Sequence, residues 1–404
     1  MKYSMVIILL SFLISYNSIL QAQWIQTTAG GAGVQCMIVK ETGIFVGTHA
    51  GGVFLSTDNG LSWTAADTGL TNLSVQNFAA NNSYLFAATY NGGVFLSTND
   101  GKNWTAVNIG LSNLKVYGLG FYPPNVYAGT DGSGLFLSTN YGNSWTNVGF
   151  TNKTVGDIAV RNSIVFAGVS YSNGGVYRSM DSCKSWTLVM NGVTDKNVLN
   201  LAVNGSNLYL GTAYNGLFLS TNDGDNWTNL NNGLTDDVWF IVFHNSNFFA
   251  STGHGVYLST NSGADWINVS DGLTNLFVTS LVIQNNYLFA GCGNNGWVWR
   301  RPLSEMITDV KDDEQLPKEF TLYQNYPNPF NPSTKISWQL PVGNIVKLKV
   351  YDILGREIIT LVNEYKPLGK YETEFNAANF PSGVYFYRIQ AGSFVETKKM
   401  MLLK

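Results

Sequence analysis

An eight-residue segment, which we call the box, occurs six times and constrains this sequence more than any other feature. The first copy is Ser56-Thr57-Asp58-Asn59-Gly60-Leu61-Ser62-Trp63, and the others occupy residues 97–104, 138–145, 179–186, 220–227 and 259–266. The tryptophans that end the copies are spaced 41, 41, 41, 41 and 39 residues apart. Each copy places small polar residues and a turn-forming position between two segments rich in β-forming residues. This pattern predicts a β-hairpin at every copy.

Each repeat is predicted to contain four short strands. The third strand recurs seven times, from Val53-Phe54 to Trp297-Val298, and no box follows the last copy. The fourth strand also recurs seven times, but its first copy is Trp24-Ile25-Gln26, ahead of all the boxes. Four strands at a period near 41 residues are typical of a propeller blade, which buries both faces only by stacking on its neighbours. The sequence therefore predicts an all-β, seven-bladed β-propeller over residues 23–301, with the N-terminal strand closing the last blade.

The repeated segment resembles the Asp-box, or BNR, repeat of sialidases and sortilin-type receptors, whose pattern is Ser/Thr-x-Asp-x-Gly-x-Thr-Trp. Asp58 and Asp181 occupy the Asp position in two copies, and asparagine, which keeps the acceptor oxygen, occupies it in the other four. Cys183 replaces the glycine of the fourth copy, where we expect a strained turn. The resemblance implies that the boxes are structural hairpins on the outer rim, without a catalytic role.

The first 22 residues are predicted to be a signal peptide. Lys2 precedes an apolar core that begins with Met5-Val6-Ile7-Ile8-Leu9-Leu10, and Leu20-Gln21-Ala22 fits a cleavage site. The core is too short to span a bilayer, and no other stretch reaches the roughly 18 apolar residues that a span needs. We therefore expect a soluble, extracytoplasmic protein that starts near Gln23 and has no transmembrane segment.

Charge and cysteine content narrow the classes of partner and cofactor. Charged residues make up 12% of the chain, and the net charge is −3. Nucleic-acid binding needs clustered Lys and Arg, which are sparse before residue 300, so we exclude nucleic acid. The three cysteines fit no metal-site or redox spacing, and Cys36 and Cys292 form either a disulfide across adjacent blades or two buried free thiols. We expect no cofactor and no metal site, and calcium binding stays open.

Two sets of loops on one face of the ring form the predicted binding face. One set connects an outer strand to the next inner strand, and the other joins the second and third strands of a blade. Residues that vary between repeats at these places are His49, Tyr90, Asp131, Tyr171, Tyr214 and His254 in the loops, and Tyr117 and Trp239 at the start of inner strands. Aromatic side chains there are suited to stacking on sugar rings or holding a peptide. The alternative interpretation is that they only fill the mouth of the ring.

We predict that the propeller recognises a glycan or a protein without catalysis, and two alternatives stay open. One is a structural surface propeller without a discrete ligand. The other is a secreted glycoside hydrolase that uses Asp131 and Asp157, which come from adjacent blades on the predicted binding face, as its carboxylate pair. Sialidase activity is excluded, because sialidases use three arginines and only Arg161 and Arg178 precede residue 300.

The composition changes after Trp299-Arg300-Arg301. Residues 302–318 are rich in charge and poor in large apolar residues, which predicts a solvated linker. Residues 319–404 are predicted to form a separate, small Ig-like β-sandwich of about seven strands. The segment 326–332 carries three prolines, which exclude a helix or a central strand there.

Several motifs in residues 320–404 resemble the type A C-terminal sorting domain of the type IX secretion system. They are Tyr-Pro-Asn-Pro-Phe-Asn-Pro at 326–332, Tyr-Asp-Ile-Leu-Gly-Arg at 351–356, Ser-Gly-Val-Tyr-Phe-Tyr at 382–387 and Lys-Lys-Met at 398–400. The resemblance implies recognition by an outer-membrane translocon and cleavage by a sortase-like peptidase. The residues that carry it are Tyr326, Pro327, Asn328, Pro329, Phe330, Gly383, Lys398 and Lys399. We therefore expect a protein that passes through the periplasm to the outer surface of a Gram-negative bacterium, or beyond it.

Overall fold

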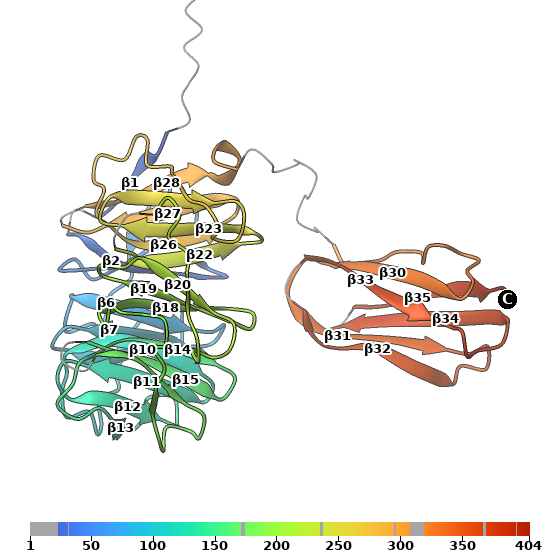
Figure 1. Cartoon of the computed structure of the whole chain (residues 1–404), viewed down its shortest axis with the longest axis horizontal. Coiled ribbons are helices and arrows are strands. Elements are labelled where there is room, and N and C mark those ends of the chain that lie inside the picture. Colours follow the sequence, from blue (N-terminus) through green and yellow to red (C-terminus); the bar gives the residue numbers. More distant parts are fainter. Residues whose placement is uncertain are drawn as a thin grey trace, which may run out of the picture. The chain divides into compact units, whose positions relative to one another are not determined.

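The computed structural model describes residues 23–30, 32–170, 174–234, 237–294, 296–307, 319–366, 369–392 and 394–404. The chain divides into two units, residues 1–308 and residues 309–404, which are considered separately (Figure 1). Within the described residues, the elements are strands and one short 3₁₀ helix, η1 (Leu303–Glu305). The prediction of an all-β protein is confirmed.

The first unit contains seven four-stranded antiparallel sheets in its described residues. The first four are β2 (Val34–Lys40), β3 (Gly43–Thr48), β4 (Val53–Ser56) and β5 (Thr64–Ala65); β6 (Val75–Ala80), β7 (Leu85–Thr89), β8 (Gly93–Ser97) and β9 (Thr105–Ala106); β10 (Val116–Tyr122), β11 (Asn125–Thr130), β12 (Gly134–Ser138) and β13 (Thr146–Gly149); and β14 (Val155–Arg161), β15 (Ile164–Val169), β16 (Gly175–Ser179) and β17 (Thr187–Leu188). The last three are β18 (Val198–Asn204), β19 (Asn207–Thr212), β20 (Leu217–Ser220) and β21 (Thr228–Asn229); β22 (Phe240–His244), β23 (Asn247–Thr252), β24 (Gly255–Ser259) and β25 (Ile267–Asn268); and β26 (Val278–Gln284), β27 (Tyr287–Cys292) and β28 (Trp297–Pro302) with β1 (Ile25–Gly30).

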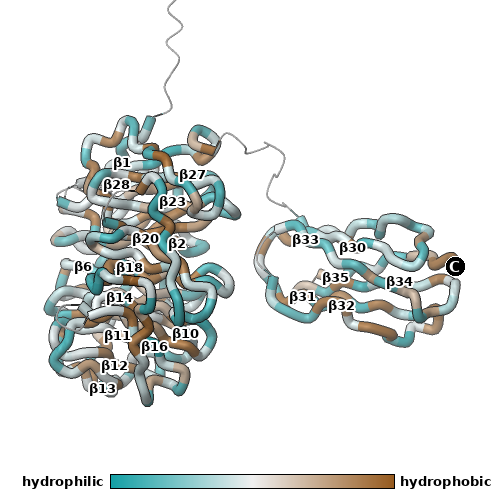
Figure 2. The backbone as a smooth tube through the Cα atoms, viewed as in Figure 1, coloured by the Kyte–Doolittle hydropathy of each residue, from teal (hydrophilic) through white to brown (hydrophobic). Residues whose placement is uncertain are grey.

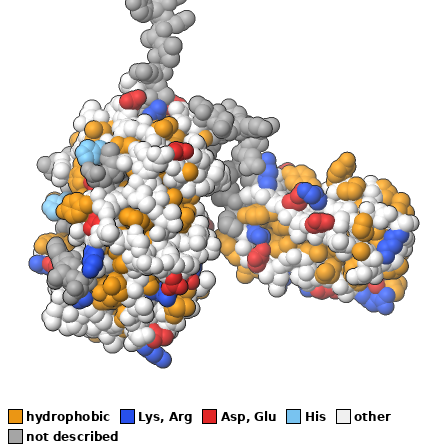
Figure 3. Space-filling model, viewed as in Figure 1, with side chains coloured by type: hydrophobic (Ala, Val, Ile, Leu, Met, Phe, Trp, Pro, Cys, Tyr) orange, Lys and Arg blue, Asp and Glu red, His pale blue; other side chains and the backbone are white. Residues whose placement is uncertain are grey.

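Apolar side chains fill the space between neighbouring sheets. Second strands such as β3 and β7 are buried at every residue, because a sheet stacked on both sides buries both of its faces. In Figure 2, hydrophobic residues concentrate in the strands of this unit and hydrophilic residues in its loops. Charged side chains are sparse on the propeller surface in view (Figure 3). Burial between sheets therefore holds the ring together.

The N-terminal strand closes the ring, as predicted. β1 pairs antiparallel with β28, with Ile25 opposite Arg300 and Gln26 opposite Trp299. The inner strand β2 packs against β6 on one side and against β26 on the other, so the first and last sheets are neighbours. The predicted position of the last third-strand motif was wrong by one residue. Val298 lies opposite Gly291 as Val53 lies opposite Gly47, so the motif is Val298-Trp299.

The repeated boxes form hydrogen-bonded turns. The Ser56 hydroxyl accepts a hydrogen bond from the Gly60 amide at 2.8 Å, and Asp58 accepts one from the Ser62 amide at 2.9 Å. Asn99 accepts the corresponding bond at 3.0 Å, so asparagine preserves the turn. Cys183 adopts a φ of 66°, which disfavours a residue with a Cβ and supports the expectation of strain in that copy.

The tryptophan that ends each box donates a hydrogen bond to the preceding sheet. Trp104 donates from Nε1 to the carbonyl oxygen of Ala66 at 2.8 Å, although the two residues belong to different sheets. The other tryptophans bond in the same manner to Val269 (from Trp24), the Thr27 hydroxyl (from Trp63), Val107 (from Trp145), Val148 (from Trp186), Val189 (from Trp227) and Leu230 (from Trp266). The spacing of 39 or 41 residues thus places one such hydrogen bond at each sheet boundary.

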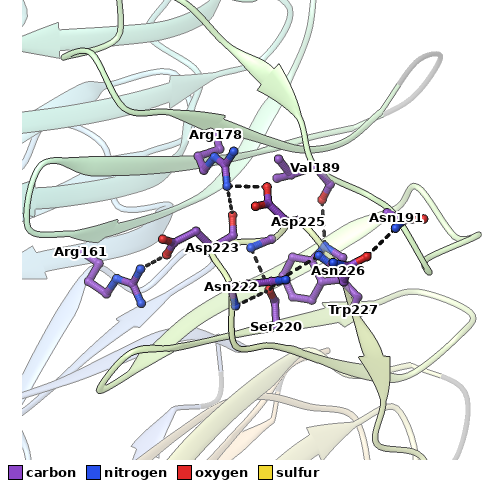
Figure 4. Close-up of polar contacts among 11 residues, drawn as sticks. Arg161, Arg178, Val189, Asn191, Ser220, Asn222, Asp223, Asp225, Asn226 and Trp227 are labelled. Atoms are coloured by element: carbon purple, nitrogen blue, oxygen red, sulfur yellow. Dashed lines mark hydrogen bonds and ion pairs between the residues drawn. The ribbon is translucent and has the colours of Figure 1, made fainter.

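Ion pairs made by Lys and Arg side chains also cross several of these sheet boundaries. Figure 4 shows Arg161 and Arg178 of the fourth sheet reaching the box of the fifth sheet, where they pair with Asp223 and Asp225. Lys40 likewise spans the first boundary to Asp100, at 2.8 Å. Arg161 and Arg178, the two arginines counted when sialidase activity was excluded, therefore stabilise the contact between sheets.

The three cysteines are buried and free. Of the two alternatives left open by the sequence, the structure has separate thiols at Cys36 and Cys292. Burial raises the pKa of the Cys36 thiol, and it raises the pKa of Cys183 and of Cys292 to about 12. Thiolates are therefore scarce at neutral pH, and the three side chains act as small apolar groups.

Residues 303–307 extend the propeller instead of starting the linker. We predicted a solvated linker from residue 302, but Leu303, Met306 and Ile307 are buried in the core formed with the last two sheets. Their apolar side chains are more stable against the sheet than in water. The rest of the predicted linker, residues 308–318, lies outside the described residues, as does the predicted signal peptide.

The second unit consists of two facing sheets, as the sandwich prediction requires. One sheet contains β29 (Thr321–Leu322), β30 (Ser333–Leu340) and β33 (Gly369–Asn376). The other contains β32 (Glu357–Lys366), β31 (Asn344–Tyr351), β34 (Gly383–Ala391) and β35 (Phe394–Leu402). Alternate residues, including Trp338, Leu348 and Tyr387, point into a shared core. The seven strands match the predicted number, and the Ig-like classification stays a prediction.

Candidate functional site

The two loop sets of the predicted binding face are hydrogen-bonded to each other. The His49 amide donates to the Gly33 carbonyl at 2.9 Å, and the Tyr90 amide donates to the Ser74 carbonyl at 2.9 Å. Asp131 makes the same bond to Lys115, at 3.0 Å. Each second-to-third-strand loop therefore lies beside the start of its own inner strand, and both loop sets share one face.

A pocket of about 310 Å³ lies on this face where the ring closes. It is lined by Ala32, Gly33, Gln35, His49 and Asn294. Four of these residues come from the loop into β2, from β2 itself and from the β3–β4 loop, and Asn294 comes from the β27–β28 loop. The pocket therefore lies between the first and last sheets, and it includes the predicted residue His49.

Three predicted residues gather on the second and third sheets. The rings of Tyr90 and Tyr117 are 5.9 Å apart, and the Lys115 ammonium lies 5.3 Å from the centre of the Tyr90 ring. Lys115 is also 3.8 Å from the Asp131 carboxylate, which accepts a hydrogen bond from Thr154 at 2.9 Å. These side chains form a partly exposed aromatic and charged group, which we call the tyrosine cluster.

A second group lies on the sixth and seventh sheets. Asp237 accepts hydrogen bonds from Trp239 Nε1 at 2.6 Å and from the Gly253 amide at 3.1 Å. His254 Nδ1 is 3.9 Å from the same carboxylate, and the Trp239 ring meets Phe277 edge-on at 5.2 Å. We call these side chains the tryptophan cluster. It brings together two predicted residues, Trp239 and His254.

The two remaining predicted residues of this face, Tyr171 and Tyr214, belong to neither cluster. Tyr214 is 70% exposed, and its amide donates to Asp195 at 2.8 Å. Tyr171 lies outside the described residues. Sequence reasoning missed Lys115 and Phe277, each of which immediately precedes the buried valine that begins an inner strand. Variation at that position between the repeats was the signal that could have found them.

The alternative carboxylate pair has other roles in the structure. Asp157 accepts hydrogen bonds from the Leu201 amide at 2.6 Å and from Asn200 at 3.2 Å, which join the fourth sheet to the fifth. Burial raises the pKa of Asp157 to about 6. Asp131 is held by Lys115 and Thr154. These contacts assign both carboxylates to positioning neighbouring chain segments.

The sorting residues of the second unit are brought together from its two ends. Asn328 accepts a hydrogen bond from the Met401 amide at 2.9 Å, and the Phe330 amide donates to the Met401 carbonyl at 3.0 Å. The Phe330 ring is buried, whereas Tyr326 is 81% exposed. The 326–332 segment is therefore fastened to the last strand, β35.

Other predicted sorting residues have distinct surroundings. The Pro327 carbonyl accepts a hydrogen bond from Thr334 at 2.8 Å, and Pro329 is exposed. Gly383 begins β34 opposite Leu402. Lys398 pairs with Glu396 at 3.0 Å, and Lys399 is exposed opposite Phe386. The exposed members are accessible to a partner, and they are Tyr326, Pro327, Asn328, Pro329, Gly383 and Lys399.

The described residues contain no group of three or more His, Cys, Asp and Glu side chains placed to hold a metal ion. They also contain no helix that is long and apolar enough to cross a bilayer.

Comparison with family models identifies a domain in each unit. Residues 324–403 match the secretion system C-terminal sorting domain. Residues 21–155 match the DUF6242 β-propeller domain. No curated protein matches the sequence.

Solved structures with the same fold differ in what they do. PorZ, a surface component of the type IX secretion system of Porphyromonas gingivalis, has a TM-score of 0.52 and 15% identity over 91% of this chain and 59% of that chain. A GH74 xyloglucanase from Xanthomonas campestris has a TM-score of 0.57 and 16% identity over 79% and 59%. YCF48 bound to a D1 peptide has a TM-score of 0.56 and 13% identity over 74% and 99%. At these identities the likeness shows the fold alone.

The matched domains and the arrangement of strands agree on the identity of both units. The second unit is the sorting domain that the sequence motifs predicted. Such a domain directs its cargo to the outer surface or to the surroundings of the cell. This chain is therefore a β-propeller with a C-terminal sorting domain of the type IX secretion system, exported to the cell surface or beyond it by a Gram-negative bacterium.

Proposed function

We propose that the exported propeller is a non-catalytic recognition module that binds a glycan or a protein through the predicted binding face. The observation that carries this proposal is the pocket at the ring closure, which is lined by Gln35, His49 and Asn294. In a concave site, a small number of placed polar groups fixes the orientation of a ligand. The tyrosine and tryptophan clusters supply aromatic surface on the same face.

The contacts of the carboxylates favour recognition over glycoside hydrolysis. Hydrolysis needs one carboxyl group as acid and a second as base or nucleophile, on either side of the scissile bond. Asp157 binds the backbone of the next sheet, and Asp131 binds Lys115 and Thr154. The YCF48 complex provides a precedent for peptide binding on this fold, and the GH74 xyloglucanase shows that the fold also serves enzymes.

The second unit serves as the export address. Its partners are the translocon of the type IX system and a sortase-like peptidase, which would remove the unit in the segment that precedes it. The exposed side chains of Tyr326 and Lys399 lie on segments joined by Asn328, so one partner surface can contact both ends of the domain. Removal of the domain would leave the propeller as the mature functional part.

An array of glycans and extracellular proteins tests the recognition role. The exported chain, residues 23–404, is applied as wild type, as the double variant Gln35→Ala and His49→Ala, and as His244→Ala. His244 lies at the far end of β22 and is the matched control, because it is a histidine on the opposite face. We expect a ligand that the double variant loses and His244→Ala keeps. Binding that all three proteins share, or cleavage of a polysaccharide by the wild type, would contradict the proposal.

A further inference from the structure

The pocket at the ring closure exists because the chain leading into β2 is unusually small. That segment reads Ala29-Gly30-Gly31-Ala32-Gly33, and Val34 begins the inner strand. Two residues before the corresponding valines, three other sheets carry a leucine where this one has Ala32. They are Leu73, Leu114 and Leu276, which are 41%, 40% and 43% exposed. A methyl group in place of an isobutyl group leaves room on the predicted binding face at this one boundary.

The polar side chains that line the pocket are available to a ligand. None of the residues that the structure describes forms a hydrogen bond with the side chains of Gln35, His49 or Asn294. The backbone of His49 is nevertheless fixed by its bond to Gly33, so the imidazole projects from an ordered loop. Two amides and an imidazole offer both donors and acceptors. The described lining includes no Lys, Arg, Asp or Glu.

An exposed tryptophan begins β28, three residues after the pocket residue Asn294, at a position that is glycine in every other sheet. The glycines are Gly52, Gly93, Gly134, Gly175, Gly216 and Gly255, all with positive φ. A Cβ at any of them would lie 2.0–2.9 Å from an atom of the following chain, so no side chain fits there. In the seventh sheet this place is taken by Trp297, which extends β28 opposite Gly30. Because Gly30 has no side chain, the indole has room.

Trp297 is the most exposed of the eleven tryptophans, at 37%. It follows the pocket residue Asn294 by three positions, and its partner Gly30 precedes the pocket residue Gly33 by three. The chain segments that carry the indole and the unpaired polar groups therefore adjoin at the ring closure. The exposed part of the indole offers an apolar, aromatic surface on which a ligand can pack.

We infer that this site binds a neutral saccharide unit, with the sugar packed on Trp297 and its hydroxyl groups bonded by Gln35, His49 and Asn294. This inference rests on the proposed recognition function and specifies its ligand. A sugar ring combines an apolar C–H face with hydroxyls that both donate and accept, which matches one indole beside amides and an imidazole. An anionic sugar would require a cation, and the described lining offers none. The volume lies at the lower end of small-molecule pockets, as expected for a site that holds one unit of a longer chain.

Titration of neutral oligosaccharides into the exported chain tests the inference. A glycan array that holds neutral, sulfated and sialylated members, printed beside a peptide array, selects the oligosaccharide, and calorimetry then measures its affinity. We expect a neutral hit that Trp297→Ala weakens at least about tenfold and Trp297→Phe weakens less, because phenylalanine keeps an aromatic face. Tyr122→Ala is the matched control, an exposed aromatic at the far end of β10, on the opposite face of the ring. It should leave the affinity within about twofold, since it does not touch the pocket.

The possible outcomes separate this inference from the proposed function. Hits confined to anionic glycans, or an equal loss in Trp297→Ala and Tyr122→Ala, overturn the saccharide site at the ring closure. Peptide hits without glycan hits also overturn it, but they leave recognition by the propeller standing. The absence of hits on both arrays overturns both statements. Thermal unfolding of each variant confirms that a lost signal reflects the site, because Trp297 and Tyr122 lie outside the core.

Discussion

The propeller and the sorting domain are both exported β domains, but different kinds of contact stabilise them. The 282 residues from 23 to 304 contain 24 charged side chains, whereas the 86 residues from 319 to 404 contain 17. In the propeller one contact, from a box tryptophan to the preceding sheet, repeats around the ring. In the sorting domain a single segment, 324–330, is tied to a strand about 70 residues away. Repetition distributes stability, and a single clasp concentrates it at the ends of the domain.

This difference predicts that the largest effect of a small change falls on the sorting domain. Deleting residues 398–404 removes Met400 and Leu402, which are fully buried, together with the partners of Asn328 and Phe330. We expect the propeller to remain in the periplasm, as measured by cell fractionation and immunoblotting.

A double variant separates folding from recognition in that experiment. Lys398→Ala with Lys399→Ala removes two side chains that make no core contact. If the lysines are read by the export machinery, this variant folds but is exported poorly. Normal surface display of the truncated chain would show that the unit is not the address.

In the propeller, loss of one box tryptophan should be severe but local. Trp104→Ala removes a buried indole and its bond to Ala66, and we expect a cost of about 3–5 kcal/mol in the free energy of unfolding. Trp104→Phe keeps most of the apolar area but leaves the carbonyl unpaired, for about 1–3 kcal/mol. Urea unfolding followed by circular dichroism measures both. Equal, small costs for the two variants would mean that the ties between sheets are dispensable.

A smaller effect should follow from loosening the clasp of the sorting domain. Asn328→Ala removes the acceptor for the Met401 amide, an exposed hydrogen bond that we expect to contribute about 1 kcal/mol. Hydrogen exchange should become faster in residues 398–404 and stay unchanged in β31, which lies in the middle of its sheet. Exchange that accelerates equally in both places would indicate one cooperative unit without a separate clasp.

The smallest effects concern two aspartates of the propeller whose pKa values move in opposite directions. Hydrogen bonds from the Ser62 hydroxyl and amide lower the pKa of Asp58 to about 2, so its contribution to stability is present above pH 4 and is lost as the pH falls towards 2. Burial raises the pKa of Asp157 to about 6, so the fold loses stability as the pH rises from about 4 through 6.

Asparagine variants test the two signs, since asparagine keeps an acceptor without a charge. Asp58→Asn should be less stable than wild type at pH 5 but not at pH 2. Asp157→Asn should match or exceed wild type above pH 7 and lose that advantage at pH 4. Thermal unfolding across this range measures both, and shifts of the same sign in the two variants would contradict the assignment.

The sequence alone determined the repeat, the ring and the address. A spacing of 39 to 41 residues between Trp24, Trp63 and Trp104 indicates similar sheets. An unmatched first strand indicates closure, because an open ring would leave an apolar face in water. The proline motif and the final lysines identified the sorting domain, which the family comparison confirms.

Only the tertiary structure decided which varied residues meet. Tyr90 and Tyr117 come from different sheets. The loops place Asp237 against Trp239 and His254, and the repeat spacing in the sequence does not reveal this contact. The pocket at the ring closure depends on small residues from the first sheet and a loop of the last, separated by about 260 positions. Repeats reveal what is shared between units, whereas a binding site is made by departures from the repeat, and their chemistry depends on which departures the fold brings into contact.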